Sequence, residues 1–337
     1  MIDFMEILKK KKPIIWEEIQ KYLPTEGPED FIEIVSEYPR RQGKYGRGAL
    51  ILLSCEGFGE DPSKAVKTAA AMQMSEDWLL VHDDIQDYSE ERRGKPALHK
   101  IHGIGLAMNA GDYMHLLMWK ILMDNREVLD EETTWKIMKE FYRFLEITAR
   151  GQHLEHVMMK KDLEKLEYDD YYGIVYGKAA EYTINGPLRL GAIIAGKGDD
   201  ILEKISEVGI PLGIAFQIRD DILNIVGKQN VYGKEIGGDI LEGKRTLMII
   251  HLIKNAEEND RKKIIEIMKK QRKEKTNEDV RYIIDMMKKY GSIEFAENKA
   301  KEFADKALSK FKEYFSDMKN KEEIEAAINF FALKRTV

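Results

Sequence analysis

Two stretches of this chain place carboxylates directly after an apolar helical run. The first runs from Leu79 to Asp87, where Asp83, Asp84 and Asp87 follow the pattern Asp-Asp-x-x-Asp. On an α-helix, residues four apart lie on one face about one turn apart, so Asp83 and Asp87 should point the same way. Carboxylates this close repel each other unless a cation neutralises them. Because Mg²⁺ prefers one or two carboxylates with phosphate oxygens and water, the stretch predicts a magnesium site.

The second stretch, Phe216 to Asn224, repeats this design, with Asp220 and Asp221 after an apolar run and a polar residue three positions on. A single Asp-Asp pair in a highly charged chain is usually a solvated helix end, but each of these pairs is followed by a basic segment. These segments hold Arg92, Arg93 and Lys95 after the first pair, and Lys228, Lys234 and Lys244 after the second. Clustered Asp with clustered Arg and Lys is what a Mg²⁺-diphosphate requires, because both the cation and the anion must be held.

The order of these pieces resembles the trans-isoprenyl diphosphate synthases, which form the polyprenyl synthetase family. The resemblance rests on the two Asp-rich motifs, on Gly43-Lys44-Tyr45-Gly46-Arg47-Gly48 and on Arg92-Arg93-Gly94. It implies an all-α isoprenoid synthase fold with a central cavity, usually in a homodimer. It also implies a Mg²⁺-dependent transferase that condenses isopentenyl diphosphate with allylic diphosphates. In the family the two motifs face each other across the cavity and share three Mg²⁺ ions.

The resemblance assigns roles to individual residues. The metal ligands would be Asp83, Asp84, Asp87, Asp220 and Asp221, and the catalytic residues Asp83, Asp220, Lys178 and Gln217. The allylic diphosphate would be held by Arg92, Lys178, Lys234 and Lys244. Phe216 would stabilise the allyl cation by cation–π attraction, with ordinary core packing as its alternative role. Two positions near these residues depart from the family: Ala179 replaces a Thr beside Lys178, and Asn224 stands where many relatives carry a third Asp.

A second basic set, Lys44, Arg47 and Arg93, matches the family's site for isopentenyl diphosphate. Arginine suits this site because its planar fork binds phosphate oxygens in pairs. Glu76 occupies the position, seven residues before Asp83, where the family usually has His or Gln. A carboxylate beside a diphosphate should repel it, so Glu76 is expected to be turned away, salt-bridged or protonated.

Two large side chains before the first motif bear on product length. Leu79 and Trp78 lie four and five residues before Asp83. In the family, bulk at these two positions closes the floor of the cavity. A Trp floor beside a Leu predicts a short product, farnesyl or geranylgeranyl diphosphate, of C15 to C20. The alternative is that Trp78 packs in the core away from the cavity.

The elements that must position these groups are read from apolar spacing. Residues 1–23 predict amphipathic helix interrupted at Pro13, with the lysine run 9–12 as a solvated end, and a basic loop is expected from Arg40 to Gly48. Further helices are expected at 28–38, from 48 through Cys55, from Pro62 to Gly94, and at 104–124, 131–160, 168–195, 200–226, 245–255, 258–271, 277–290, 292–316 and 320–334. No strand or hairpin pattern stands out. Residues 1–337 therefore predict one all-α domain.

Composition excludes several classes. The net charge of −6 argues against a general nucleic-acid binder. Cys55 is the only cysteine, so no intrachain disulfide can form. No run of about 18 apolar residues predicts a transmembrane helix, and the first residues do not have the order of a signal peptide. The protein is expected to be cytoplasmic.

Three other functions share single features with this sequence. An HD-type phosphohydrolase could use His82-Asp83, but it needs further His ligands and the first 81 residues contain none. A class I terpene cyclase needs a second motif with Ser or Thr and Glu, which Asp220-Asp221-x-x-Asn224 does not match. A non-catalytic or regulatory subunit of a heteromeric synthase stays open because of Glu76, Ala179 and Asn224.

Overall fold

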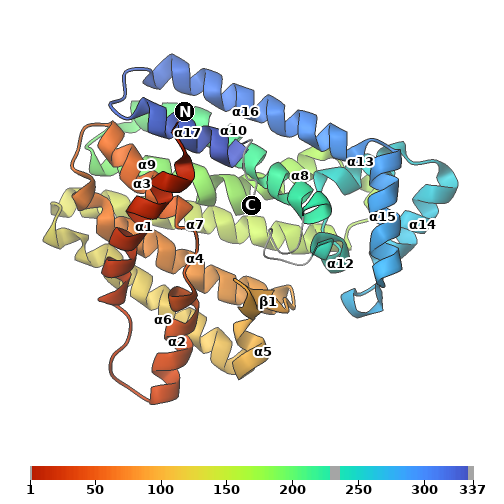
Figure 1. Cartoon of the computed structure of the whole chain (residues 1–337), viewed down its shortest axis with the longest axis horizontal. Helices are drawn as coiled ribbons and strands as arrows, with labels where there is room; N and C mark the ends of the chain where they lie inside the picture. Colours follow the sequence, from red (N-terminus) through yellow and green to blue (C-terminus); the bar gives the residue numbers. More distant parts are fainter. Residues whose placement is uncertain (1, 228–235, 333–337) are drawn as a thin grey trace. The chain divides into compact units, whose positions relative to one another are not determined.

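The computed structural model describes residues 2–227 and 236–332 (Figure 1). Its backbone contacts divide the chain into two compact units. The first unit contains Met1–Arg143, Ile184–Ser206 and Phe311–Ala327, and the second contains Phe144–Thr183, Glu207–Lys310 and Ile328–Val337. The predicted all-α class is confirmed, whereas the single domain over 1–337 stays a prediction. Lys228 and Lys234 lie outside the described residues.

The N-terminal part of the first unit builds a helical layer around one long helix, α4. The helices here are α1 (Phe4–Gln20), α2 (Glu29–Arg41), α3 (Gly46–Gly57), α4 (Val66–Gln86), α5 (Leu98–His102) and α6 (Ile104–Met123). Asp61 accepts a hydrogen bond from the Ser63 N–H and starts the 3₁₀ turn η1 (Pro62–Ala65) that leads into α4. α4 packs against α1, α3 and α6, and Figure 1 shows it running beside α6. The Ala-rich first half of α4 is buried in these contacts.

Helix α1 continues through Pro13, so the predicted interruption is wrong. Proline removes one N–H from the helical ladder, which normally breaks or kinks a helix interior. Here Pro13 is exposed, while Ile15 and Ile19 on the opposite side are fully buried. Because water can satisfy the freed carbonyl and the apolar stripe stays continuous, packing outweighs the lost bond.

A short hairpin follows α4, which also corrects the sequence prediction. The helix ends at Gln86 rather than near Gly94, and β1 (Glu91–Arg92) pairs antiparallel with β2 (Lys95–Pro96). The turn between the strands has positive φ at Arg93 (53°) and at Gly94 (73°). Positive φ at both central residues of a two-residue loop matches the twist of the strands. Two-residue strands carry no alternation signal, so the pattern could not reveal them.

The remaining elements are mostly helical, as predicted. They are η2 (Asp124–Glu127), α7 (Glu131–Lys160), η3 (Leu163–Lys165), α8 (Tyr168–Val175), η4 (Tyr176–Asn185), α9 (Gly186–Ile194), α10 (Asp199–Val226), α12 (Gly238–Glu242), α13 (Leu247–Asn255), α14 (Glu258–Lys269), η5 (Arg272–Glu274), α15 (Asn277–Lys289), α16 (Ser292–Phe315) and α17 (Lys321–Ala332). In the second unit, α13 lies against α8, α14 and α15. Its buried face, from Leu247 to Ile253, is the centre of an aliphatic core.

The helix predicted over 168–195 is divided into three segments. α8 is followed by a stretch of π-helix, η4, and then by α9, where Pro187 lies in the first turn. Proline is tolerated there because its missing N–H would have had no partner. The wider π turns are uncommon and often mark functional sites. η4 carries Lys178 and Ala179.

No helix among the described residues combines the length and apolar character that crossing a membrane requires.

Candidate active site

The end of α4 presents Asp83 and Asp87 one turn apart. The Asp87 N–H donates to the Asp83 carbonyl at 2.8 Å, which closes the last turn of the helix. The Asp83 side chain is one-quarter exposed, and its Oδ2 lies 3.8 Å from Nη2 of Arg92. Two hard oxygen donors on adjacent turns fit Mg²⁺, which takes one or two carboxylates and completes its shell with phosphate and water.

Asp84 is oriented differently from its two neighbours. It is fully buried, and Nε of Arg92 lies 3.0 Å from each of its oxygens. The Tyr38 hydroxyl donates to its Oδ2 at 2.6 Å. Both carboxylate oxygens are thus engaged by a buried ion pair that ties the hairpin to α4. Asp84 as a metal ligand, and Arg92 as a diphosphate ligand, stay predictions, and in this structure the two residues bind each other.

The second Asp pair lies near the end of α10, where Asp221 is buried. It accepts hydrogen bonds from the Tyr171 hydroxyl and from Nε2 of Gln217, each at 2.8 Å. Burial raises the pKa of the Asp221 carboxyl well above its usual value, and the nearby charges of Asp239 and Asp220 raise it further. Buried carboxylates that repel one another favour the binding of a divalent cation, because the cation would neutralise their negative charge.

Asn224 contacts the segment from Gly237 to Asp239, where α12 begins. The Asp239 N–H donates to Oδ1 of Asn224 at 3.1 Å, and the Gly237 N–H donates to the Asn224 carbonyl at 2.7 Å. Asn224, in place of a third Asp, therefore holds the start of α12 against α10. The sequence analysis did not assign Asp239, although its position after two glycines was a usable signal.

No group of three or more His, Cys, Asp or Glu side chains placed to hold a metal ion is found in residues 2–227 and 236–332. The fit to Mg²⁺ rests on the two pairs described above.

The predicted site for isopentenyl diphosphate is assembled in the first unit. Arg47 stands in the first turn of α3, and its Nη1 lies 3.2 Å from Oε2 of Glu76. Nη2 of Arg93 lies 3.8 Å from the other Glu76 oxygen and 2.8 Å from Oδ1 of Asp77. Of the three possibilities for Glu76, the structure shows the salt bridge. Lys44 belongs to the segment that precedes α3.

The pKa values of the neighbouring acids Glu76 and Asp77 are shifted in opposite directions. Burial would raise the pKa of Glu76, but Arg47 and Arg93 outweigh it and hold that pKa below the usual value. Burial raises the pKa of Asp77 to about 6, because Arg93 compensates its charge only in part. Glu76 therefore stays ionised in mildly acidic solution, whereas its neighbour Asp77 takes up a proton as the pH falls through about 6.

Two further residues at this site, Gln73 and Lys12, were missed by the sequence analysis. The Gln73 amide lies against both carboxyls, and Nζ of Lys12 lies 5.5 Å from the centre of the Tyr45 ring. Burial lowers the pKa of Lys12, and the charge of Arg93 lowers it further. The lysine run 9–12 is therefore not simply a solvated end: Lys12 adds positive charge to this site. Gln73 was findable as a polar residue one turn before Glu76.

Lys178 is held by a close glycine contact in the second unit. A Cβ on Gly151 would lie 2.4 Å from the backbone nitrogen of Lys178. Only glycine therefore lets α7 and η4 approach so closely. Across this contact the Lys178 ammonium pairs with Oε2 of Glu155. The neighbouring Ala179 is buried and presents no hydroxyl.

Two other residues predicted to contact substrate, Lys244 and Phe216, contact protein side chains in the second unit. Nζ of Lys244 lies 2.7 Å from Oε2 of Glu242 and 3.7 Å from Oδ1 of Asp239. Phe216 is buried and meets Phe331 edge to face, with ring centroids 5.5 Å apart. This contact agrees with the core role weighed for Phe216, and its cation–π role stays a prediction.

Trp78 packs between α4 and α6 within a group of rings. Its centroid lies 4.7 Å from that of His115 and 5.6 Å from that of His82. The Trp119 indole N–H donates to Nε2 of His115 at 3.0 Å, which holds the imidazole against Trp78. Trp78 therefore has a fixed partner on α6. Leu79 beside it is half-buried.

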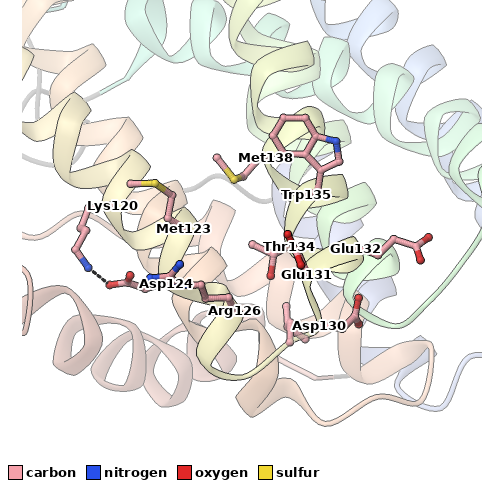
Figure 2. A pocket seen from close by; sticks show the side chains of 11 residues that line it. Lys120, Met123, Asp124, Arg126, Asp130, Glu131, Glu132, Thr134, Trp135 and Met138 are labelled. Atoms are coloured by element: carbon pink, nitrogen blue, oxygen red, sulfur yellow. Dashed lines mark hydrogen bonds and ion pairs between the residues drawn. The ribbon is translucent and has the colours of Figure 1, made fainter.

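An open pocket of about 1270 Å³ lies where α6, η2 and the start of α7 meet (Figure 2). It is lined by four carboxylates against two cations, and one of these cations, Lys120, is paired with Asp124. Excess negative charge would repel a diphosphate, so this pocket does not suit the predicted substrates. Met123, Trp135 and Met138 supply its apolar wall.

Comparison with known proteins identifies the family. The sequence profile of the polyprenyl synthetase family matches residues 29–287. A geranylgeranyl diphosphate synthase of Saccharolobus solfataricus is 33% identical over 87% of this chain and 86% of its own. A short chain isoprenyl diphosphate synthase of Methanothermobacter thermautotrophicus is 31% identical over 88% of each chain.

Solved structures show the same fold. The crystal structure of a geranylgeranyl pyrophosphate synthetase from Pyrococcus horikoshii has a TM-score of 0.87 and 30% identity, and covers 98% of both chains. A polyprenyl synthase from Caulobacter crescentus, complexed with calcium and isoprenyl diphosphate, has a TM-score of 0.85 at 25% identity, and covers 99% of this chain and 97% of its own. The resemblance read from the Asp motifs is confirmed, and the chain belongs to the polyprenyl synthetase family.

Proposed function

We propose that this protein is a Mg²⁺-dependent prenyltransferase that condenses isopentenyl diphosphate with allylic diphosphates to give C15 to C20 products. The observation that carries the proposal is the chemistry of its two polar sets. One is a group of buried and partly buried carboxylates around Asp221, whose mutual repulsion fits divalent cations. The other is the pair Arg47 and Arg93. Their guanidinium groups both lie near the Glu76 carboxylate, an arrangement that suits a diphosphate.

The allylic diphosphate leaves as an anion when its C1–O bond breaks. When bound through Asp83, Asp87 and Asp220, three Mg²⁺ ions would supply positive charge that stabilises this leaving group. Lys178 and Lys244, now paired with Glu155 and Glu242, would turn their ammonium groups to the same oxygens.

The second substrate supplies the alkene. Arg47, Arg93 and Lys44 would hold its diphosphate, which fixes the alkene near the allylic C1. The alkene electrons form the new C–C bond, and a proton is then lost to the released diphosphate. Gln217, already oriented by its hydrogen bond to Asp221, would position the reacting groups.

Product length would be set by Trp78 on α4. The ring contact with His115 gives the indole a firm support, so a growing chain that met it could not displace it easily. This supports a short product, and Trp78 as the cavity floor is part of the proposal.

The deciding experiment is an incubation of purified protein with Mg²⁺, isopentenyl diphosphate and each of the C5, C10 and C15 allylic diphosphates. Radiolabelled products separated by chromatography should be C15 or C20. A matched reaction with EDTA should give none. If no allylic substrate is extended by the folded protein, the proposal is wrong and a regulatory subunit becomes the better explanation.

We also propose that the protein forms a homodimer through α6. Exposed apolar side chains recur on one side of this helix at spacings of four, eight and seven residues. They are Ile104, Met108, Leu116 and Met123, each between 45% and 64% exposed. Trp135, 55% exposed on α7, extends this face to the pocket of Figure 2. An exposed apolar stripe this long favours burial against a second copy of the chain.

Light scattering during gel filtration tests the dimer. Leu116→Glu should convert a dimer into a monomer, because a charge would lie within the apolar contact. Ile14→Glu changes an exposed isoleucine on α1 and serves as the control, which should stay dimeric. A wild-type monomer, or a dimeric L116E, would rule out this interface.

A further inference from the structure

A second pocket, of about 550 Å³, lies within the second unit and is strongly basic. It is formed by the end of α7, the end of α12 and the segment between α14 and α15. Its cations are Lys160, Lys161, Arg245, Lys269, Lys270 and Lys275, whereas its carboxylates are Asp162 and Glu242. None of the residues assigned above to substrates or metal lines it.

Two of these cations, Arg245 and Lys275, are buried and form no ion pair with any residue that the structure describes. Arg245 is 7% exposed and donates from its two Nη atoms to the carbonyls of Gly243 and Met159, at 2.8 and 2.6 Å. Lys275 is 8% exposed and donates to the Leu241 carbonyl at 2.9 Å. Within the described part of the chain, neither has a carboxylate within 4.0 Å. Their hydrogen bonds go to neutral carbonyl oxygens, and the charges of Asp279 and Glu242 act on Lys275 only from a longer distance.

The positive charge here is therefore in excess. Burial lowers the pKa of Lys275 to about 8, and the charges of Arg245 and Arg272 lower it further. Burial also lowers the pKa of Arg245 to about 10. Glu242 does little to offset this, because it already pairs with Lys244 at 2.7 Å and with Arg272 at 3.5 Å. Buried cations of this kind are stabilised by an anion.

We propose that this pocket binds a free phosphate-type oxyanion, inorganic phosphate or diphosphate, between Arg245 and Lys275. Nε of Arg245 is buried and has no hydrogen-bond partner in residues 2–227 and 236–332, where Lys275 uses one of the three protons on its ammonium group. These donors match the several acceptor oxygens of a phosphate. Capping of helix ends by cations accounts for the carbonyl contacts, but it leaves these donors unused.

The position of the pocket gives the anion a source. Arg245 directly follows Lys244, which is predicted to hold the allylic diphosphate. Each condensation releases one inorganic diphosphate, so the reaction's by-product has the chemistry that this pocket would bind. This last point rests on the proposed function, whereas the binding itself does not.

Calorimetric titration of the full-length protein tests the site directly. Inorganic phosphate and diphosphate are titrated in EDTA, without substrates, into wild type, Lys275→Met and Lys273→Met. Lys273 is exposed two residues away and does not line the pocket, so K273M removes the same charge outside it. We expect K275M to bind at least tenfold more weakly than wild type, and K273M to bind like wild type. Lys275→Arg, which keeps the charge, should retain binding.

Two measurements keep the result interpretable. Hydrogen exchange should show protection of residues 241–246 and 268–276 on adding phosphate to wild type but not to K275M. Thermal unfolding without anion verifies that each variant is folded. Phosphate should raise the unfolding temperature of wild type, K273M and K275R, but not that of K275M. Equal affinity in wild type and K275M, an equal loss in K273M, or binding of geranyl phosphate but not of inorganic phosphate would overturn the proposal. Because no turnover is measured, an inactive protein could still pass this test.

Discussion

Replacing Glu76 by Gln should strengthen the binding of isopentenyl diphosphate. Glu76 now holds both arginines of the proposed diphosphate site, with Arg47 at 3.2 Å and Arg93 at 3.8 Å. A diphosphate that takes these guanidinium groups must approach the carboxylate, and like charges repel. Glutamine has nearly the same shape, so the substitution removes the charge and little else.

The size of the effect follows from Coulomb's law. One unit charge of a diphosphate about 5 Å from the carboxylate is repelled by roughly 3 kcal/mol at an effective dielectric of about 20. Part of this is lost because E76Q no longer holds the arginines in place. We therefore expect a net gain of about 1.4 kcal/mol, a tenfold lower KM for isopentenyl diphosphate. The kcat should change little, because the repulsion acts on bound substrate and transition state alike.

The pH dependence gives a second, independent readout. Arg47 and Arg93 hold the pKa of Glu76 low, and a diphosphate that draws them away lets that pKa rise. Binding then takes up a proton, so wild-type affinity should improve as the pH falls from about 8 to about 6. Asp77, whose pKa is raised to about 6 by burial, faces the same arginines and contributes in the same direction, and Lys12 opposes it. E76Q should show a flatter profile.

The assay is steady-state KM for isopentenyl diphosphate at pH 6, 7 and 8, with saturating allylic substrate. Ionisation of the substrate itself affects both proteins equally and cancels in their ratio. Glu132→Gln, which removes an exposed carboxylate paired with Lys136, is the control and should behave like wild type. An unchanged or higher KM in a folded E76Q would refute the reasoning, since Glu76 would then only position the arginines.

Four other substitutions test separate parts of the site. Asp83→Ala should lower kcat/KM about a thousandfold, roughly 4 kcal/mol of transition-state stabilisation, and near-normal turnover of D83A in EDTA would exclude the mechanism. Arg47→Ala should raise the KM for isopentenyl diphosphate far more than that for the allylic substrate, whereas equal effects would contradict the assignment. Trp78→Ala should lengthen the products by one or more C5 units on chromatography; an unchanged distribution from a folded, active variant would remove the basis for the length assignment. Burial raises the pKa of Asp77 from 3.8 to about 6, so the fold favours its protonated form. Its contribution to the free energy of unfolding, up to about 3 kcal/mol, is present below pH 3.8 and lost as the pH rises through 6, and Asp77→Asn should lack this fall in urea titrations at pH 4, 5 and 8.

What could be predicted from the sequence depends on local patterns. Helix α7 has the predicted bounds, 131–160, because its apolar spacing is regular and both ends lie in polar segments. Asp83 and Asp87 lie on adjacent turns as expected, since their spacing alone determines this. Features of this kind involve only residues within one or two turns of each other, so a periodic pattern contains them.

Features that depend on distant partners were not predictable in this way. Asp84 belongs to the same motif as Asp83, yet it turns inward because Arg92 and Tyr38 supply buried donors. Arg92 reaches it only because α4 stops at Gln86 and the chain reverses in a hairpin. The hairpin has two residues in each strand, too few for any alternation to be seen.

The pair Glu76 and Asp77 shows most clearly where sequence reasoning ends. The position of Glu76, seven residues before Asp83, predicted a charge conflict with diphosphate and left three possible outcomes for this side chain. Which outcome occurs depends on Arg47, in the first turn of α3, and on Arg93, placed by a hairpin turn with a positive φ of 53°. Glu76 lies near both arginines and Asp77 only near Arg93, so one carboxyl is kept charged and its neighbour is pushed towards the neutral form. The charge that a diphosphate meets at this site is therefore set by tertiary packing, and it can be altered by substitutions that leave the motif itself intact.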